Sequence, residues 1–529
     1  MTNYLLSLLI FLPLIGAVAM LFVPVERGSW FKWMALGITS AQLLLSVILW
    51  VGFDGQVVPT SWENAFQFVE RVPWIHMQMD GLAVLKVDYF VGVDGISAPL
   101  VVLSALILVI GVISSWKLSK KVKGYFILYL ILGSSVIGCF VALDFFLFYL
   151  FFEFMLLPMF FLIGIWGGKR RQYASVKFFI YTLVGSLFIL VVMIGLFLNV
   201  EEGGSNTFSL VRMMNPAAFV SDGLLSDGGQ WELWGLSARA WAFWFLVIGF
   251  LIKLPAVPVH TWLPDAHVEA PTAISVILAG LLLKVGGYGL FRIAFPIFPE
   301  QAVGFATPIA ILGVIAIIYG GLVAMAQTDL KRLVAYSSVS HMGFVLVGLS
   351  AFTIQGVSGG LFQMVSHGLL SPALFLLVGV LYDRTSDRQI ENFSGLAGHL
   401  PIYTFFVGVF FFASLGLPGL SGFVGELLVL LGAFGSGQLA QWIGMVAVTG
   451  ILISAAYFIW TLQRMFFGKY WVRKDEWQAH MTDITPREWL MLAPLALLVI
   501  WLGLFPSTML QPIHESMKFW VQHFFTTIP

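Results

Sequence analysis

Fourteen runs of mostly apolar residues, each long enough to cross the roughly 30 Å hydrocarbon core of a bilayer, constrain this chain of 529 residues more than any other feature. Hydrophobic residues make up 59% of the sequence and charged residues 10%, so too few polar side chains are present to coat a soluble globule of this size. The sequence therefore predicts a polytopic membrane protein. We expect spans at residues 4–23, 30–51, 96–115, 125–143, 145–166, 174–198, 240–259, 272–294, 303–325, 334–351, 357–382, 401–434, 441–467 and 487–504.

The spans are predicted to be helices, which makes the expected fold class all-α. A membrane strand must alternate between lipid-facing and lumen-facing side chains, and the continuous apolar run at 145–154 lacks that alternation. The first run, 5–23, lacks the basic segment that precedes the core of a cleavable signal peptide. We therefore expect it to be a retained helix.

The positions of lysine and arginine predict the orientation, because loops on the inward side of a membrane protein are enriched in both. If both termini face outward, the inward loops hold most of the 27 Lys and Arg residues. These are Arg27, Lys32, Lys117, Lys120, Lys121, Lys123, Lys169, Arg170, Arg171, Lys177, Lys331, Arg332, Arg384, Arg388, Arg464, Lys469, Arg473, Lys474 and Arg487. Two long outward loops, 52–95 and 199–239, are acidic and are expected to pack over the bundle.

Several kinds of chemistry lack support in the sequence. The single cysteine, Cys139, has no partner for a disulfide and cannot by itself form a cysteine-ligated metal or iron-sulfur site. No glycine-rich nucleotide loop follows a strand, and no HExxH zinc motif occurs. We therefore expect no redox centre in this chain, and any electron transfer must take place in another subunit.

Six Lys, Glu or His side chains lie well inside the predicted spans, away from their ends, where an uncompensated charge costs several kcal/mol or more. They are Glu153, Lys253, Lys284, His341, His367 and Glu426. Intramembrane ionisable residues most often serve ion or proton pathways. This group predicts proton handling within the membrane.

Glu153 and Lys253 are the candidates for a switchable pair. At about 4 Å and an effective dielectric near 20, a carboxylate stabilises an ammonium by roughly 4 kcal/mol. A movement of the carboxylate by a few ångströms would therefore decide whether Lys253 holds its proton or passes it to the next site.

Each residue also has a purely structural alternative. Lys253 could be a static ion pair or an anchor that reaches the interface, and Glu153 could be a neutral acid bonded to a backbone carbonyl. Either histidine could be a hydrogen-bonded core residue. Lys284 lies too far from both interfaces to reach them, and its sequence neighbours include no acid.

Two of the charged spans contain residues that interrupt helices. Lys253 is followed by Pro255 and Pro258, and a Gly- and Pro-rich stretch at 416–422 precedes Glu426. Residues 125–295 and 303–467 could form two units of five helices each. Because five is an odd number, the second unit would then cross the membrane in the opposite orientation to the first. Each broken helix is the fourth helix of its unit. The remaining divisions are 1–124, with three spans and an outward loop, and 468–529, with an inward loop, the last span and a tail.

Short motifs along residues 125–467 resemble a known family, the antiporter-like membrane subunits of respiratory complex I. The motifs are FFEFMLLP at 151–158, KLP at 253–255, LPDAH at 263–267, APT at 270–272, DLKRLVAYSS at 329–338, SHMG at 340–343, LPG at 417–419 and GE at 425–426. The resemblance implies that Glu153 and Lys253 form the tuning pair and that Lys284 is the central relay. His341 would connect it to Glu426, the terminal site near the outward exit. Glutamate at this last position is typical of the M-type members, whereas L-type and N-type members usually carry lysine.

The resemblance thus implies a proton-translocating, M-type subunit of an NADH:quinone oxidoreductase in a bacterial inner membrane. NADH, FMN, iron-sulfur clusters and quinone would be bound by partner subunits, with L-type and N-type subunits and phospholipids as neighbours and no nucleic acid. Two alternatives in the same class are a subunit of an Mrp-type cation/proton antiporter and a subunit of a membrane hydrogenase or ferredoxin-linked relative. An intramembrane acyl- or glycosyltransferase using His341 or His367 as base is disfavoured, because no polar pocket with clustered acids and histidines is evident.

Overall fold

The computed structural model describes residues 4–77, 85–226, 229 and 231–527. Within these ranges, twelve helical segments are long and apolar enough to cross a membrane, and each coincides with a predicted span. They are α1 (Leu5–Phe22), α2 (Gly28–Gly52), α3 (Ser97–Ser114), α4 (Val122–Val141), α5 (Phe145–Phe154) with α6 (Leu156–Trp166), α7 (Arg171–Asn199), α11 to α13 (Thr272–Ile297), α15 (Ala306–Met325), α16 (Leu330–Ser350), α17 (Ile354–Thr385), α20 (Gln441–Phe466) and α21 (Pro486–Leu504). The chain is therefore a multi-pass membrane protein, and its spanning part is helical.

The other two predicted spans are interrupted. In the span predicted at 240–259, α9 (Ala238–Lys253) ends at Lys253, and α10 (Trp262–Glu269) begins beyond the predicted end. The span predicted at 401–434 is divided into α18 (Pro401–Ser414) and α19 (Ser421–Phe434). The first break follows Lys253, where the chain runs into two prolines that cannot donate backbone hydrogen bonds. At the second break, Gly416 and Gly419 have φ angles of +83° and +90°, a conformation that only glycine adopts readily.

The segment Thr272–Ile297 is buried throughout and does not form a regular α-helix. Short α-helical stretches, α11 (Thr272–Ile277), α12 (Leu283–Gly289) and α13 (Phe295–Ile297), alternate with two π-helical segments, Leu278–Leu282 and Leu290–Ala294. A π-helical turn disturbs the regular ladder of hydrogen bonds and is frequent at functional sites.

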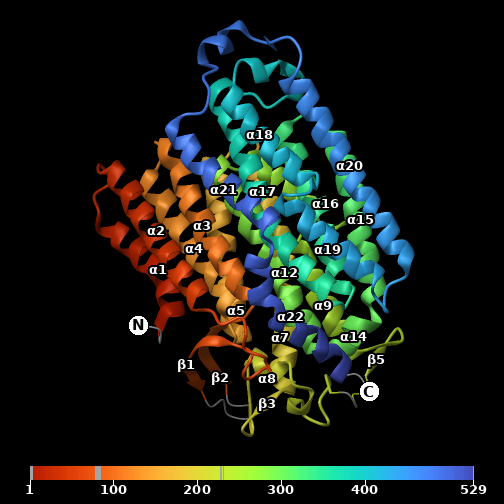
Figure 1. Ribbon diagram of the computed structural model, residues 1–529. Helices are drawn as coiled ribbons and strands as arrows, with labels where there is room; N and C mark the ends of the chain where they lie inside the picture. Colours follow the sequence, from red (N-terminus) through yellow and green to blue (C-terminus); the bar gives the residue numbers. More distant parts are fainter. Residues whose placement is uncertain (1–3, 78–84, 227–228, 230, 528–529) are drawn as a thin grey trace.

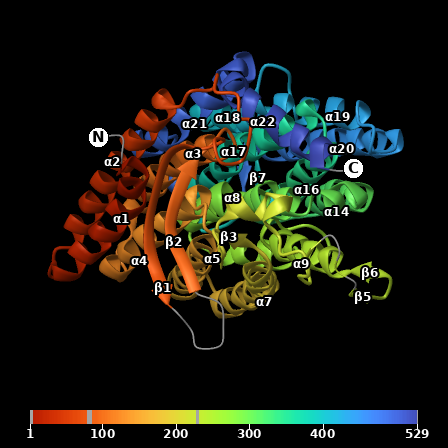
Figure 2. The same cartoon turned by 90° about the horizontal axis from the view of Figure 1, so that it is seen from below.

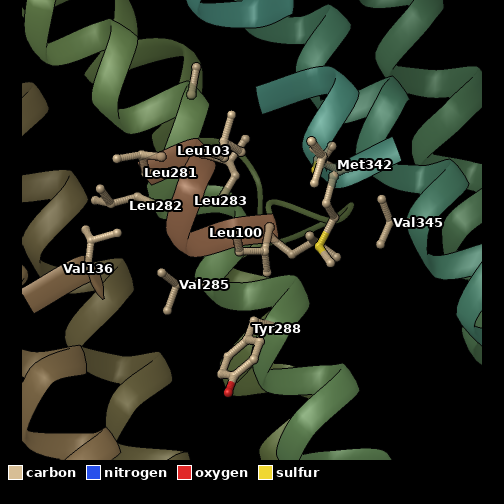
Figure 3. Packing of buried hydrophobic residues seen from close by; sticks show 14 of the residues in the cluster. Leu100, Leu103, Val136, Leu281, Leu282, Leu283, Val285, Tyr288, Met342 and Val345 are labelled. Atoms are coloured by element: carbon tan, nitrogen blue, oxygen red, sulfur yellow. The ribbon is translucent and has the colours of Figure 1, made fainter. Parts of the chain in front are cut away.

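This irregular segment lies in the centre of the bundle (Figure 1). The N-terminal helices α1 to α4 lie on one side of it, α15, α16, α19 and α20 lie on the other, and α17 packs against the segment itself. Leu281, Leu282 and Leu283 belong to one buried cluster with Leu100 and Leu103 of α3 and Met342 of α16 (Figure 3). Because these side chains are fully or almost fully buried, the segment is enclosed by protein.

The two long acidic loops that the sequence predicts to face outward form a layer of small elements over one end of the bundle. This end is named the outward end after that prediction. β1 (Gln67–Met77) and β2 (Leu85–Val93) make an antiparallel hairpin that crosses the end of the bundle near α4 and α5 (Figure 2). The smaller elements here are β3 (Glu201–Glu202), β4 (Ser205–Asn206), α8 (Leu210–Met213), β5 (Glu232–Leu233), β6 (Leu236–Ser237) and α14 (Pro299–Gly304). Both termini lie at this same end (Figure 1). At the opposite end, β7 (Phe393–Ser394) pairs with β8 (Trp471–Val472).

Ion pairs fasten this layer together. The Arg71 guanidinium in β1 lies 2.7 Å from Asp88 in β2 and 2.8 Å from Glu202 in β3. Partial burial opposes ionisation of Glu202, but its hydrogen bonds to Arg71 hold the pKa of this carboxyl at about 2. The pair therefore stays charged at neutral pH and joins the hairpin to the loop that follows α7.

The tail after the last span is a helix, which the sequence analysis did not predict. α22 (Ser507–Thr527) packs against α14 and α17 at the outward end. Trp520 is fully buried, and its indole N–H donates to the Phe291 carbonyl at 2.8 Å. Phe291 belongs to the second π-helical segment, so α22 hydrogen-bonds to the irregular central segment.

Replacement of Trp520 by alanine tests this anchor. The change removes a large buried side chain and leaves the Phe291 carbonyl without its donor, so we expect a loss of about 3–5 kcal/mol from the docking of α22. Limited proteolysis of the purified protein should then cut within 505–527 much faster than in the unchanged protein. Phe525→Ala, at an exposed position of the same helix, is the control. Equal cleavage of both variants would contradict this role for Trp520.

Candidate functional site

Four of the six predicted site residues form one row through the middle of the bundle. The row begins at Lys284 of α12, which has no solvent-exposed surface. Its ammonium lies 2.7 Å from Nδ1 of His367 in α17 and donates to the Ala279 carbonyl at 2.5 Å. Because an ammonium can only donate, Nδ1 of His367 is the acceptor when Lys284 carries its proton.

The Ala279 carbonyl that accepts from Lys284 lies in the first π-helical segment, five residues before Lys284. A carbonyl oxygen has a second lone pair, so it can accept from a side chain beside a hydrogen bond of the helix itself. The buried cation is therefore partnered in part by the backbone of its own segment.

The row continues from His367 to His341 and Glu426. The ring centroids of His367 and His341, in α17 and α16, are 5.8 Å apart. Nδ1 of His341 lies 3.1 Å from Oε1 of Glu426 in α19. Among the described residues, Nε2 of each histidine and Oε2 of Glu426 have no hydrogen-bond partner, although all three atoms are buried. Buried polar atoms of this kind indicate a site where water or a mobile proton completes the hydrogen bonding.

A narrow cavity beside the row is lined by both histidines and Glu426, and its volume of about 10 Å³ for water centres gives room for about one water molecule. The other lining residues are Ser337, Gln363, Leu370, Ser371, Leu374, Ser414 and Gly422. Hydroxyl and amide groups give a bound water the two to four polar partners that it needs. A water in the cavity can therefore link the two histidines, whose Nε2 atoms have no hydrogen-bond partner among the described residues.

The break between α18 and α19 makes room for Glu426. A Cβ atom at Gly416 would lie 3.0 Å from Oε2 of Glu426, closer than ordinary contacts. Gly416 also has the positive φ angle that a side chain would strain. Glycine at this position therefore both permits the turn and leaves space for the carboxylate.

Glu153 and Lys253 lie near one another but are not ion-paired within 4.0 Å in the described part of the chain. The Lys253 ammonium is 4.3 Å from the centroid of the Phe152 ring and has no hydrogen-bond partner among the described residues. Cys139 and Glu153 both interact with it electrostatically. The predicted pair is therefore present in a separated arrangement, and its switching role stays a prediction.

Glycines bring the end of α9 close to α12. A Cβ atom at Gly286 would lie 2.6 Å from the Leu254 backbone nitrogen and 2.7 Å from the Phe250 carbonyl oxygen. Gly286 comes two residues after Lys284, and Leu254 comes one residue after Lys253. The backbones that carry the two lysines can approach this closely only because no side chain separates them.

Sequence reasoning assigned no role to two further residues of the region, His267 and Lys331. His267 in α10 is fully buried, stacks on Phe375 with ring centroids 4.3 Å apart, and interacts electrostatically with both Lys331 and Lys284. The Lys331 ammonium donates to the Ala270 carbonyl at 2.6 Å. Both lie within recognised motifs, LPDAH and DLKRL. They were missed because α10 lies outside a long apolar run and Lys331 resembles an ordinary inward-loop cation.

Lys331 lines a second pocket, of about 210 Å³, at the end of the bundle opposite the termini. Glu269, Tyr382 and Arg388 also line it. His267 is close enough to both Lys331 and Lys284 to interact electrostatically with each of them. The polar residues therefore extend from the opposite end of the bundle to its centre.

Most of the chain matches models of known protein families. Residues 142–454 match the family model described as NADH:quinone oxidoreductase/Mrp antiporter, TM. The chain belongs to this family. Residues 60–137 also match the amino-terminal model of NADH-ubiquinone oxidoreductase chain 4, so the resemblance inferred from short motifs is confirmed.

Relatives within this antiporter family match almost the full length. The chain is 43% identical to NADH-quinone oxidoreductase subunit M of Rhodobacter capsulatus, over 98% of this chain and 97% of that protein. It is 39% identical to NADH-ubiquinone oxidoreductase chain 4 of Chondrus crispus, over 95% of each. A chain in the structure of respiratory complex I from Thermus thermophilus with bound NADH has a TM-score of 0.81 at 28% identity, covering 99% of this chain and 100% of that one.

A test of the α18–α19 break follows from the position of Gly416. Gly416→Ala forces a side chain into a left-handed conformation, which costs about 1–2 kcal/mol, and crowds Oε2 of Glu426. We expect lower thermal stability and a shifted carboxyl band for Glu426 in infrared difference spectra. Gly408→Ala in α18 is the control, because a Cβ atom there meets nothing within 4 Å. Equal behaviour of the two variants would show that the break does not position Glu426.

Proposed function

We propose that this chain is the M-type, antiporter-like subunit of an NADH:quinone oxidoreductase and that it translocates protons through buried side chains. The observation that carries the proposal is the row from Lys284 through His367 and His341 to Glu426, with contacts of 2.7 Å and 3.1 Å at its ends. Relatives named subunit M support the subunit type. Glutamate at position 426, typical of M-type members, agrees with it.

Lys253 controls the row in this mechanism. When Glu153 approaches Lys253, the ion pair holds the proton on the ammonium. When Glu153 moves away, Lys253 lies against the Phe152 ring without a hydrogen-bond acceptor, and its proton passes toward Lys284. The separated arrangement in the structure corresponds to the second condition.

Lys284 and the two histidines carry the proton onward. Protonated Lys284 donates to Nδ1 of His367, and His367 then releases a proton from Nε2 toward the cavity beside His341. His341 passes it to Glu426, whose Oε2 faces no hydrogen-bond partner among the described residues. Each proton moved outward works against about 2.3 kcal/mol per 100 mV of membrane potential. A change of a few ångströms in the Glu153 to Lys253 distance supplies energy of that order.

The remaining assignments follow from this role. We propose a bacterial inner membrane location with both termini outward, L-type and N-type neighbours, lipid contacts and an inverted repeat of residues 125–295 and 303–467. NADH, FMN, iron-sulfur clusters and quinone are assigned to partner subunits. The single cysteine supports that assignment, and the described residues contain no group of three or more His, Cys, Asp or Glu arranged to hold a metal.

Replacing Lys253 by alanine in the assembled complex should sharply reduce the number of protons pumped per electron pair. The variant lacks the group whose proton is controlled by Glu153, while the redox modules in other subunits stay folded. Proton uptake into proteoliposomes, measured with NADH-driven quinone reduction, reports the ratio. NADH-dependent reduction of ferricyanide checks that the redox modules are intact. Lys469→Ala, at an exposed loop position, is the matched control, and an unaltered ratio in Lys253→Ala would count against the mechanism.

Two substitutions of Glu426 distinguish a role in proton relay from a purely structural role of its carboxylate. Glu426→Lys keeps a group that can accept and release protons beside His341, so we expect part of the pumping to remain. Glu426→Ala removes the group, and pumping should fall to the level of a blocked relay. The same proteoliposome measurement compares the two variants. Full activity in Glu426→Ala would remove this residue from the path.

A further inference from the structure

Lys284 is the first of three polar residues on one face of the central segment. Lys284, Tyr288 and Arg292 are spaced by four residues, which places them on the same side of a helix. The Tyr288 side chain points away from the leucines at 281–283 (Figure 3). Nε of Arg292 donates to the Tyr288 hydroxyl at 3.2 Å. A second line of polar groups therefore runs from the central lysine directly toward the outward end.

This second line ends in an ion pair. The Arg292 guanidinium has no solvent-exposed surface and lies 2.5 Å from Oδ1 of Asp94. The rings of Phe66 and Tyr288 flank the guanidinium, with centroids 4.9 and 5.5 Å from its central carbon. Two aromatic rings and one carboxylate thus enclose a side chain that stays charged at every accessible pH.

Asp94 is held in place at the outward end. Its Oδ1 accepts from the backbone N–H groups of Ile96 and Ser97 at 3.0 Å each, where α3 begins. The next residue, Gly95, donates its N–H to Ser516 of α22 at 3.1 Å. The carboxylate is therefore on the outward side of Arg292, and the cation is on the side that faces Lys284.

We propose that the Asp94–Arg292 pair closes the direct outward route from Lys284 and so directs protons along the row to Glu426. This inference rests on the proposed function, because it assumes that Lys284 carries protons. A proton leaving Lys284 toward Tyr288 approaches a fixed cation that can neither accept it nor move aside, and a buried arginine is an effective barrier to cations and protons. Along the other branch, His367, His341 and Glu426 are all able to take up and release a proton.

The two branches differ in whether their last residue can take up and release a proton. The route through His367 passes a cavity lined by titratable and hydroxyl groups and ends at a carboxylate with a free oxygen. The route through Tyr288 ends at a guanidinium packed between rings. Without the pair, both ends of the central segment would be open to proton transfer, and the membrane potential would drive protons backward.

The experiment compares passive proton leak through the assembled complex in proteoliposomes, driven by a potassium diffusion potential in the absence of NADH. The double variant Asp94→Asn with Arg292→Gln removes both charges, so neither is left buried without its partner, and it is more tolerable than either single change. We expect the leak per assembled complex to rise about tenfold, because the cationic barrier is gone. Arg292→Lys keeps a cation and should leave the leak near that of the unchanged complex.

A third variant shows whether the leak uses Lys284. When Lys284→Ala is added to the charge-free double variant, the leak should return to the unchanged level, because the proton has lost its donor. An unchanged leak in the double variant would overturn the proposal, and so would a leak that persists after Lys284→Ala. Pumping that survives Lys284→Ala alone would instead reject the proposed relay, so the two failures are distinguishable. If the charge-free variant does not assemble but Arg292→Gln does, the leak of Arg292→Gln is compared with that of the unchanged complex, and no increase overturns the proposal. If neither variant assembles while Arg292→Lys does, the pair is structural and the proposal fails.

Discussion

The burial of the Lys284 ammonium, with no surface exposed to solvent, is the constraint on which the rest of the central structure depends. A cation in this position needs partners that replace water, because an unpaired buried charge destabilises a protein by several kcal/mol. The Ala279 carbonyl and the His367 ring supply them. The first partner lies in a π-helical segment, and the second requires α17 to lie against the central segment. One side chain therefore joins its own segment to α17.

The charged residues around Lys284 differ from one another in how firmly their charge is compensated. Lys253 has an aromatic ring beside it and a carboxylate beyond ion-pairing distance, so its charge is weakly compensated and sensitive to small movements. Arg292 is compensated by one carboxylate at 2.5 Å and is fixed. Between a labile and a permanent cation, Lys284 contacts His367, and His341 and Glu426 follow it in the row. The residues of the row beyond Lys284 therefore lie on α16, α17 and α19.

The sequence predicts the spans well because each span needs about twenty apolar residues, and such runs can be recognised directly in the sequence. It also locates the six titratable residues, since each stands alone in an apolar run. It cannot pair them: Lys284 and His367 are 83 positions apart, and nothing local to either residue specifies their contact. His267 was overlooked for the opposite reason, because it lies in a short helix after a break where a polar residue is unremarkable. The hairpin and α22 depend on packing against the bundle end, which is set by tertiary contacts, although the spacing of buried Met509, Ile513, Met517 and Trp520 in α22 is the helical signal that was available.

Departures from regular helix lie beside three of the candidate residues, whereas His341 and His367 lie in the continuous helices α16 and α17. A regular span satisfies its backbone groups within the helix. In this chain, α9 ends at Lys253, α18 and α19 meet at glycines beside Glu426, and π-helical segments flank Lys284 on both sides. Each departure lowers local helix stability and in return brings a backbone group, a cavity or a second helix to a titratable side chain. Local rules of helix formation are broken where the chemistry requires it, and the surrounding apolar packing keeps those positions in place.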